Sequence, residues 1–82
     1  MNRYSHSFVA VCPNNGKRIR YYLTIETDQL VMVEEIVDFC TKQEGYHEQI
    51  ADRLADRFPG VQELKAHHHG VQITTTRGVA RQ

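Results

Sequence analysis

The sequence predicts an α+β domain in which a four-stranded antiparallel sheet carries two helices on one face, in the element order ββααββ. Three observations predict this fold. Residues 17–27 alternate between apolar and polar side chains, as a half-buried antiparallel strand does. Residues 30–42 and 46–58 each carry apolar side chains at the period of an amphipathic helix. β-rich segments flank these elements, and two helices between two hairpins are expected to pack on one face of the joined sheet.

Length and composition limit the protein to a few classes. The chain has 82 residues, enough for a single domain over 1–82, and its ten Lys and Arg residues balance ten Asp and Glu residues. A broad basic surface is therefore not expected, which argues against nucleic-acid binding. No apolar run approaches the ~18 residues of a membrane span, and no signal peptide is recognisable. We expect a cytoplasmic protein with no membrane partner.

The first hairpin joins a strand over residues 5–12 to a second strand over residues 17–27. The loop between them contains Asn15-Gly16, a strong hairpin signal because both residues tolerate positive φ. On the first strand, Val9 and Val11 are expected to face the helices, which would turn Cys12 away from them. The second strand is expected to face the helices with four apolar residues, which are Ile19, Tyr21, Leu23 and Ile25. Its other face must meet water or another subunit.

The two helices have recognisable apolar stripes. Thr27-Asp28 offers an N-cap for the first helix, over residues 30–42. Its stripe consists of Val33, Ile36, Val37 and Cys40. The second helix, over residues 46–58, ends at Pro59-Gly60, and its stripe consists of Ile50, Ala51, Leu54, Ala55 and Phe58. Residues 61–69 and 71–77 are expected to form a closing hairpin that turns near His69-Gly70.

Cys12 is the first candidate for chemistry. A nucleophilic thiol needs partial exposure and a lowered pKa. Lys17 and Arg18 lie across the hairpin, and their positive charge would favour the thiolate form. The alternative is that Cys12 only fills space, as Cys40 is expected to do in the stripe of the first helix. Both are expected to be free thiols, since a cytoplasmic protein rarely keeps disulfides.

Three further residues could form a site with it. His47-Glu48 opens the second helix, where a His/Glu pair would lie at the edge of a cleft. Glu34 lies in the first helix, at the side of its apolar stripe. Each has a structural alternative: Glu48 interacts favourably with the helix macrodipole, His47 is a surface residue, and Glu34 belongs to a solvated helix face.

His67-His68-His69 raises the question of a metal site. On a strand, His67 and His69 point to one face and His68 to the other, so at most two of these imidazoles converge. A zinc site needs three or four ligands, and Cys12 or His47 would have to complete it. No metal ligand is therefore assigned, and zinc is not favoured.

The order of the segments resembles the tunnelling fold, or T-fold, of GTP cyclohydrolase I, dihydroneopterin aldolase, 6-pyruvoyl-tetrahydropterin synthase and 7-cyano-7-deazaguanine (preQ0) reductase. These proteins share an antiparallel sheet with two helices between its hairpins. Their subunits close into barrels, and purines or pterins bind at subunit interfaces through a glutamate on a helix. Residues 46–55, Y-H-E-Q-I-A-D-R-L-A, resemble that anchor segment, with Glu48 as the anchor.

The preQ0 reductase family resembles the chain more closely, over roughly residues 8–78. Its motif C-P-x-x-G is matched by residues 12–16, its V-E by Val33-Glu34, its F-H-E by residues 46–48, and its Arg-Gly by Arg77-Gly78. The family has an aspartate at the position of Ile19. Its lysine- and serine-rich NADPH stretch follows the V-E motif, where this chain has E-I-V-D-F.

The resemblance implies a function in queuosine biosynthesis. Cys12 would attack the nitrile carbon of the deazaguanine to form a thioimide, and His47 would assist proton transfer. Glu34 and Glu48 would hold the base edge, because a carboxylate accepts two hydrogen bonds from a guanine-like edge. NADPH would supply the hydride, which would make the chain an oxidoreductase, and the protein would be a homo-oligomer.

Two alternatives remain. One is another T-fold enzyme, of dihydroneopterin aldolase or GTP cyclohydrolase type, and the latter would need bound zinc. The other is a non-catalytic oligomeric T-fold protein that binds a purine or pterin, or only assembles. The sequence leaves open whether the chain is an enzyme.

Overall fold

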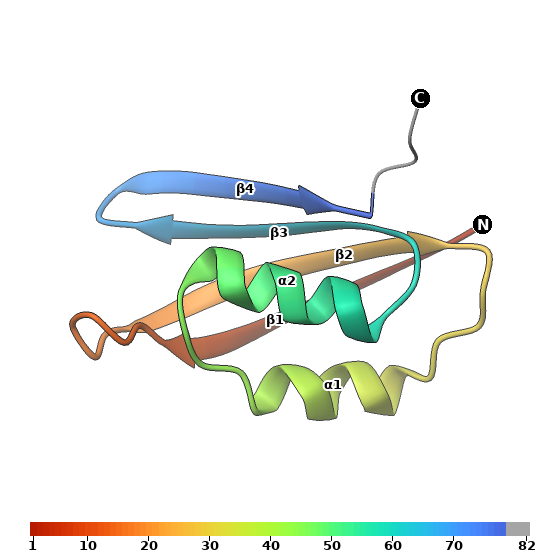
Figure 1. Ribbon diagram of the computed structural model, residues 1–82, viewed down its shortest axis with the longest axis horizontal. Helices are drawn as coiled ribbons and strands as arrows, with labels where there is room; N and C mark the ends of the chain where they lie inside the picture. The colour runs from red at the N-terminus through yellow and green to blue at the C-terminus, as the bar shows by residue number, and fades with distance from the viewer. Residues whose placement is uncertain (79–82) are drawn as a thin grey trace.

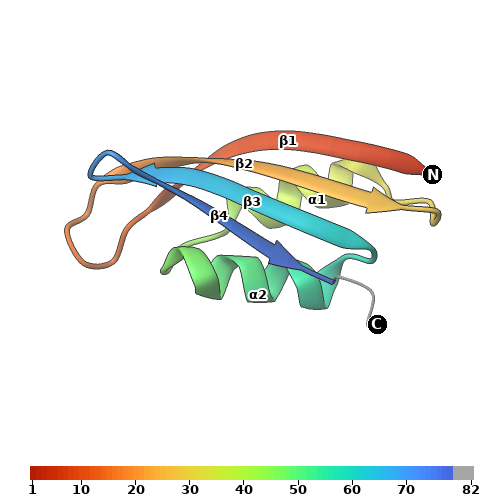
Figure 2. The same cartoon turned by 90° about the horizontal axis from the view of Figure 1, so that it is seen from above.

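The computed structural model describes residues 1–78 and confirms the predicted ββααββ order. The strands are β1 (Asn2–Val11), β2 (Arg18–Thr27), β3 (Val61–His68) and β4 (Val71–Arg77), and the helices are α1 (Val33–Thr41) and α2 (His47–Arg57). The strands form one antiparallel sheet in the order β1-β2-β3-β4, with both helices on one face (Figure 1, Figure 2). The predicted domain continues to residue 82, and residues 79–82 lie outside the described part. No helix of residues 1–78 is long and apolar enough to cross a membrane.

Strand β2 lies in the interior of the sheet and confirms the alternation that predicted it. Tyr21, Leu23 and Ile25 are buried against the helices, while Arg20 and Tyr22 on the other face are exposed. Ile25 is fully buried, and Leu23 faces the buried Leu64 of β3 across the sheet. The apolar set of β2 therefore lies at the centre of one core that includes residues of both helices.

Strand β1 faces the helices with the opposite set of side chains from the predicted one. Phe8 and Ala10 are buried, as is Cys12 just beyond the strand, whereas Val11 is exposed. The register decides this, because Phe8 pairs with Tyr21 and Ala10 pairs with Ile19, and directly paired residues share a face. The prediction that Val9 and Val11 face the helices is therefore wrong.

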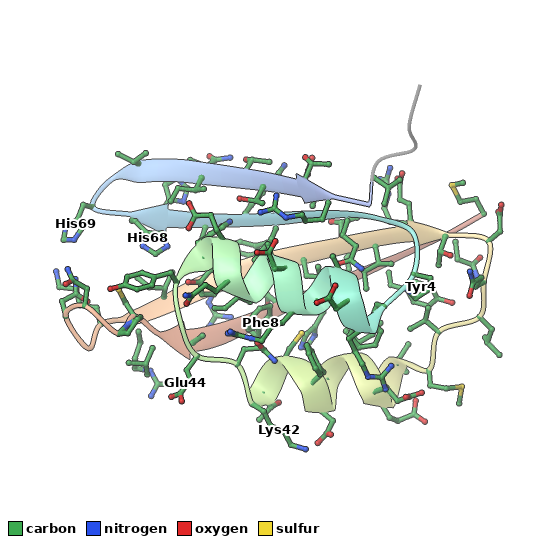
Figure 3. The ribbon with its side chains drawn as sticks, viewed as in Figure 1. Tyr4, Phe8, Lys42, Glu44, His68 and His69 are labelled. Carbon is green, nitrogen blue, oxygen red and sulfur yellow. The ribbon has the colours of Figure 1, made fainter. Side chains whose placement is uncertain are left out.

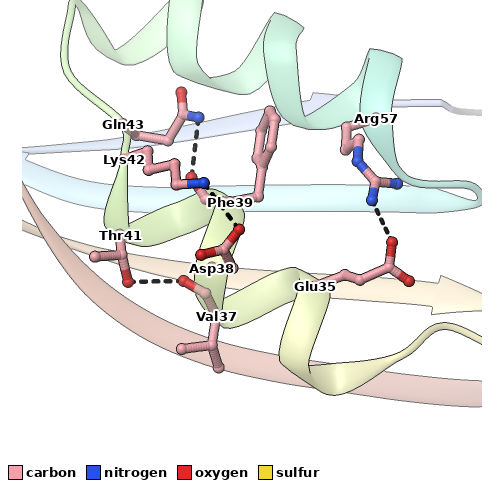
Figure 4. A network of polar contacts seen from close by, with 8 residues as sticks. All are labelled: Glu35, Val37, Asp38, Phe39, Thr41, Lys42, Gln43 and Arg57. Atoms are coloured by element: carbon pink, nitrogen blue, oxygen red, sulfur yellow. Dashed lines mark hydrogen bonds and ion pairs between the residues drawn. The ribbon is translucent and has the colours of Figure 1, made fainter.

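Helix α1 buries only half of its predicted stripe. Ile36 and Cys40 are buried, but Val33 and Val37 are 54% and 47% exposed. The helix is rotated toward α2, where the Phe39 ring meets the Phe58 ring edge-on at 5.6 Å between centroids. Figure 4 shows Val37 pointing away from α2, while Glu35 on the other side of α1 pairs with Arg57 of α2. The predicted burial of Val33 and Val37 is thus wrong.

The start of α1 also differs from the prediction. The helix begins at Val33 after Met32, which makes no side-chain capping bond. Thr27 does not cap it; its hydroxyl oxygen instead accepts a hydrogen bond from the Gln29 amide at 3.1 Å in a local turn. Helix α2, in contrast, begins near its predicted start, where the Gln49 side chain accepts a hydrogen bond from the Tyr46 amide.

The two hairpin loops have different geometries. In the loop between β1 and β2, the Cys12 carbonyl accepts a hydrogen bond from the Gly16 amide at 2.8 Å, and Gly16 alone has a positive φ, of 72°. The predicted hairpin is confirmed, although Asn15 does not use the positive φ that it tolerates. The loop between β3 and β4 is a two-residue turn in which His69 and Gly70 have φ values of 51° and 82°, as a type I′ turn requires.

Both hairpin loops lie at the same end of the molecule as the N-terminus of α2 (Figure 1, Figure 2). Three segments that are distant in sequence therefore meet there: the loop after Cys12, the first turn of α2 at His47, and the β3–β4 turn at His69. This end of the sheet carries the candidate site.

Candidate functional site

A cavity of about 330 Å³ opens between the two hairpin loops and the start of α2. Its chemistry comes from four residues, which are Cys12, His47, Glu48 and His68. The remaining lining residues are Asn14, Asn15, Lys17, Ile19, Tyr46, His69 and Ile73. The volume is at the lower end of the range for small-molecule sites, about 300–1,000 Å³, so the cavity suits a small ligand.

His47 is a buried wall of the cavity, not a surface residue. It continues the apolar stripe of α2 toward the N-terminus, and only 2% of it is exposed. Its Nε2 donates a hydrogen bond to the carbonyl oxygen of Leu64 at 3.1 Å, because a carbonyl can only accept. Burial lowers the pKa of His47, so the neutral imidazole predominates at neutral pH and Nδ1 carries a lone pair.

His68 lies beside His47 on the helix side of β3, at the end of the strand (Figure 3). The two imidazole rings are 6.0 Å apart between centroids and nearly perpendicular. Among the side chains of residues 1–78, the buried polar atoms that lack a hydrogen-bond partner are Nδ1 of His47 and Nε2 of His68. Buried polar groups are nearly always paired, so these two nitrogens need an explanation.

Tyr21 lies beneath the two histidines. Its ring stacks on Phe8 at 5.3 Å between centroids and lies 5.4 Å from His47 and 6.2 Å from His68. Burial raises the pKa of Tyr21, and the nearby Cys12 and Glu48 raise it further. The phenol therefore stays protonated at neutral pH and adds a hydroxyl group to this end of the core.

Cys12 lines the cavity but is only 8% exposed, so the predicted exposed thiol is wrong. Its backbone amide donates to the Lys17 carbonyl at 2.8 Å, which holds the residue at the neck of the loop. Lys17 belongs to the same cavity wall, whereas Arg18 is not among the lining residues. Cys40 is fully buried in the core, as expected, and burial raises its pKa to about 11.

The two candidate glutamates lie in different places. Glu48 is exposed in the first turn of α2 and lines the cavity. Glu34 lies on α1 beside Val33 and Val37, in a shallow groove that shares no residue with the cavity of Cys12. Within one chain, the structure therefore brings together Cys12, His47 and Glu48 but not Glu34.

Sequence reasoning missed two residues of this site. The alternation of β2 places Tyr21 on its core face and gives no sign of a site, and the run His67-His68-His69 suggests only a metal ligand at His68. The signal for His68 was present in the alternation of β3, which places it on the same face as the buried Ala66 and Leu64. No group of three or more His, Cys, Asp or Glu side chains within residues 1–78 is arranged to hold a metal ion.

A second cavity, of about 430 Å³, lies on the sheet face opposite the helices. It contains charged residues of both signs, and these pair with one another: Arg3 with Glu26, and Lys65 with Glu63. It contains neither a cysteine nor a histidine. The cavity at the hairpin end is therefore the better candidate for ligand binding.

Arg77-Gly78 has a structural role. A Cβ on Gly78 would overlap the carbonyl oxygen of Gly60, so only glycine fits where β4 ends against the start of β3. Arg77 donates a hydrogen bond to Asp52 of α2 at 2.7 Å, which joins the sheet to that helix. Neither residue lines the candidate cavity.

In comparison with known proteins, no protein-family profile matches the chain, and no curated protein sequence matches it. A solved structure does: the crystal structure of the archaeosine synthase QueF-Like in the apo form. The two share 14% sequence identity, the match covers 98% of this chain and 95% of that one, and the TM-score is 0.63. At this identity the likeness shows the fold alone, and it confirms the predicted one. The chain has the tunnelling fold, a four-stranded antiparallel sheet with two helices on one face.

Proposed function

We propose that this protein binds a small planar nitrogen heterocycle of purine or pterin type in the cavity at the hairpin end, with Glu48 as the anchor. The observation that carries the proposal is the meeting of Cys12, His47 and Glu48 around one cavity. The three residues come from segments that are distant in the sequence, the end of β1 and the start of α2. The same cavity has the size of a small-molecule site.

Glu48 supplies the recognition chemistry. A carboxylate accepts two parallel hydrogen bonds from an N–H and an NH₂ group on one ring edge, as in guanine, deazaguanine and pterin. Glu48 lies in the first turn of α2, where the helix macrodipole favours the ionised form. An adenine-like edge has no such pair of donors, so the anchor favours guanine-like rings.

Cys12 supplies the reactive chemistry if the ligand carries a nitrile. The thiolate would add to the nitrile carbon of 7-cyano-7-deazaguanine, the nitrile nitrogen would take up the proton, and a thioimide would form without change of oxidation state. Reduction would then need NADPH as hydride donor, making the protein a reductase-like oxidoreductase of queuosine biosynthesis. The neighbour's description as an archaeosine synthase supports chemistry on deazaguanine compounds.

A non-catalytic binding protein is the second candidate function. Ile19 lines the cavity at the position where the reductase family has an aspartate, so the wall offers a hydrocarbon instead of a carboxylate there. A dihydroneopterin aldolase or GTP cyclohydrolase activity is a third, and a metal assay on the purified protein would identify the cyclohydrolase. In each case we propose a cytoplasmic homo-oligomer.

A binding screen tests the proposal. Guanine, 7-cyano-7-deazaguanine, neopterin and GTP are added to the full chain, and thermal unfolding is recorded. A ligand at 100 times its Kd stabilises the native state by about 2.7 kcal/mol, which is a measurable shift. Oxidation of NADPH in the presence of 7-cyano-7-deazaguanine then separates the reductase from the binding protein. Absence of a shift with all four compounds would contradict the proposed function.

A further inference from the structure

The inner wall of the candidate cavity carries two buried nitrogen atoms that no protein group satisfies. They are Nδ1 of His47 and Nε2 of His68, on two different elements, α2 and β3. Both residues line the cavity, so a ligand that enters it comes next to the two rings that carry these nitrogens. An unpaired buried polar group destabilises the folded state, and a ligand that pairs with it recovers part of that loss.

The hydrogen bond to Leu64 determines what His47 offers. Nε2 must carry the proton because its partner is a carbonyl oxygen. Since burial keeps the ring neutral, Nδ1 carries an unpaired lone pair and is able to accept a hydrogen bond. A ligand carbonyl placed against Nδ1 would meet lone pair against lone pair, so this position selects for a hydrogen-bond donor.

His68 sits where it can share that role. Its ring centroid lies 6.0 Å from that of His47 and 6.2 Å from that of Tyr21. Glu48, the residue after His47, adds a carboxylate at the outer rim of the same cavity. The cavity therefore presents hydrogen-bond acceptors at two depths, a carboxylate outside and an imidazole lone pair inside.

We infer that His47 and His68 form an inner subsite that binds an uncharged N–H or O–H donor of the ligand, distinct from the edge held by Glu48. The inference rests on the proposed function only in using the same cavity. A ligand of this site has donors on two separate edges, as a free guanine-like base has on its pyrimidine ring and on its five-membered ring. A ligand with a single donor edge would satisfy Glu48 and leave the histidines unpaired.

The test is ¹⁵N NMR of the full chain labelled at its histidine ring nitrogens, with two probes. Guanine is the first probe, and formamide is the second, because it is a neutral N–H donor without the bicyclic shape. Hydrogen bonding moves the resonance of a lone-pair nitrogen upfield. We expect guanine to shift Nδ1 of His47 and Nε2 of His68, and formamide to shift the same two nitrogens at higher concentration.

A matched pair of variants measures the contribution to affinity. His68→Phe keeps a flat ring and removes the nitrogens, whereas His67→Phe makes the same change on the exposed opposite face of β3. We expect His68→Phe to weaken guanine binding about tenfold, the scale of one hydrogen bond, and His67→Phe to leave it unchanged. His47 itself is left intact because its bond to Leu64 supports the fold.

The outcomes separate the inference from the proposed function. Guanine binding that requires Glu48, with unmoved histidine resonances and equal affinities in the two variants, would overturn the inference and keep the proposed function. If formamide shifts the His47 resonance but no bicyclic compound binds, the inference is kept and the proposed function is overturned. No shift at His47 with either probe would overturn the inference.

Discussion

The Nε2 of His47 lies 3.1 Å from the carbonyl oxygen of Leu64 and donates a hydrogen bond to it. This bond joins the first residue of α2 to β3, whose Leu64 is itself buried in the core. One contact therefore holds the start of α2 against the sheet and orients the imidazole that lines the cavity. Stability and the shape of the cavity wall consequently depend on the same side chain.

Stability should fall in mild acid because of His47. Burial lowers its pKa below the usual 6.5, so the unfolded chain takes up a proton before the folded chain does. The stabilising contribution of the neutral imidazole is complete above the unfolded value. It is lost as the pH falls from there toward the folded pKa, by at most about 1.4 kcal/mol per pH unit.

Urea unfolding between about pH 8 and pH 5 measures this effect. The comparison is with His47→Phe, which cannot titrate and also lacks the bond to Leu64. We expect the variant to be less stable at neutral pH and the difference to shrink as the pH falls. A difference in stability that stays constant over this pH range would mean that the pKa of His47 is the same in the folded and the unfolded chain.

The two cysteines should differ in reactivity. Cys40 is fully buried, and burial raises its pKa to about 11, so almost no thiolate forms near pH 8. Cys12 is buried from bulk water but borders the cavity. We expect iodoacetamide to alkylate Cys12 first, more slowly than a free thiol, and guanine to slow it further, as peptide mass spectrometry can show. If the two cysteines are alkylated at equal rates and guanine protects neither, Cys12 has only a packing role.

The fold was predictable where the two faces of an element differ in polarity. Strand β2 alternates apolar residues with polar or charged ones, so only one register buries its apolar face. Strand β1 lacks this difference between its two faces. One face carries Phe8, Ala10 and Cys12, the other carries Val9 and Val11, and either set could be buried in a core. Only the pairing of Phe8 with Tyr21 decides between them, and that long-range contact cannot be derived from the periodicity of one strand.

Helix α1 shows the same ambiguity. Val33 and Val37 form one apolar line and Ile36 and Cys40 form another, and a nine-residue helix can bury only part of both. Packing against α2 rotates α1 so that the second line is buried (Figure 4). In the site, two signals for His47 disagree. Its spacing from Ile50, Ala51 and Leu54 on α2 favours a buried position, whereas a polar residue at the start of a helix is usually exposed.

Glu48→Gln should weaken ligand binding without affecting the fold. The substitution removes the charge from the hydrogen bonds to the ligand edge, which are worth about 1.5–3 kcal/mol, or more than tenfold in Kd. Because Glu48 is exposed, the free energy of unfolding should change by less than ~1 kcal/mol. Glu44→Gln is the matched control, because Glu44 is exposed and does not line the cavity.

Glu34→Gln tests the second predicted anchor. Titration calorimetry with guanine measures the Kd of this variant and those of Glu48→Gln and Glu44→Gln. Within one chain Glu34 is outside the cavity, so a loss of affinity equal to that of Glu48→Gln would place Glu34 at the cavity of a neighbouring subunit. An unchanged Kd would restrict it to the solvated face of α1. Equal affinities for Glu48→Gln and Glu44→Gln would refute the anchor role of Glu48.

Gly60→Ala should be strongly destabilising. Gly60 has a φ of 91°, and a Cβ there would overlap the carbonyl oxygen of Glu26. Gly70→Ala is the matched comparison, since Gly70 has a φ of 82° but no atom lies within 4 Å of its Cβ position. Gly70→Ala should lower the free energy of unfolding only by the cost of the left-handed conformation, about 1–2 kcal/mol. Gly60→Ala should lower it by clearly more, because of the overlap with Glu26. Similar melting temperatures for the two variants would contradict this packing.

The protein should assemble through the open edge of its sheet. Strand β1 is a ten-residue edge without proline, and its one strongly charged side chain, Arg3, is neutralised by Glu26. The exposed Val33 and Val37 of α1 adjoin this edge, in a groove shared with Tyr4 and His6. A second copy that extends the sheet at β1 would cover both the unpaired backbone groups and these apolar side chains.

Light scattering over a series of concentrations measures this assembly. We expect a mass of several chains, and we expect Val37→Glu to reduce it, because a carboxylate would then enter the covered groove. Circular dichroism of Val37→Glu should be unchanged, since Val37 is 47% exposed in the single chain. A monomer at high micromolar concentration would contradict assembly at this edge. An unchanged mass for Val37→Glu would mean that the chains join without covering the α1 groove, as they would by pairing at the β4 edge alone.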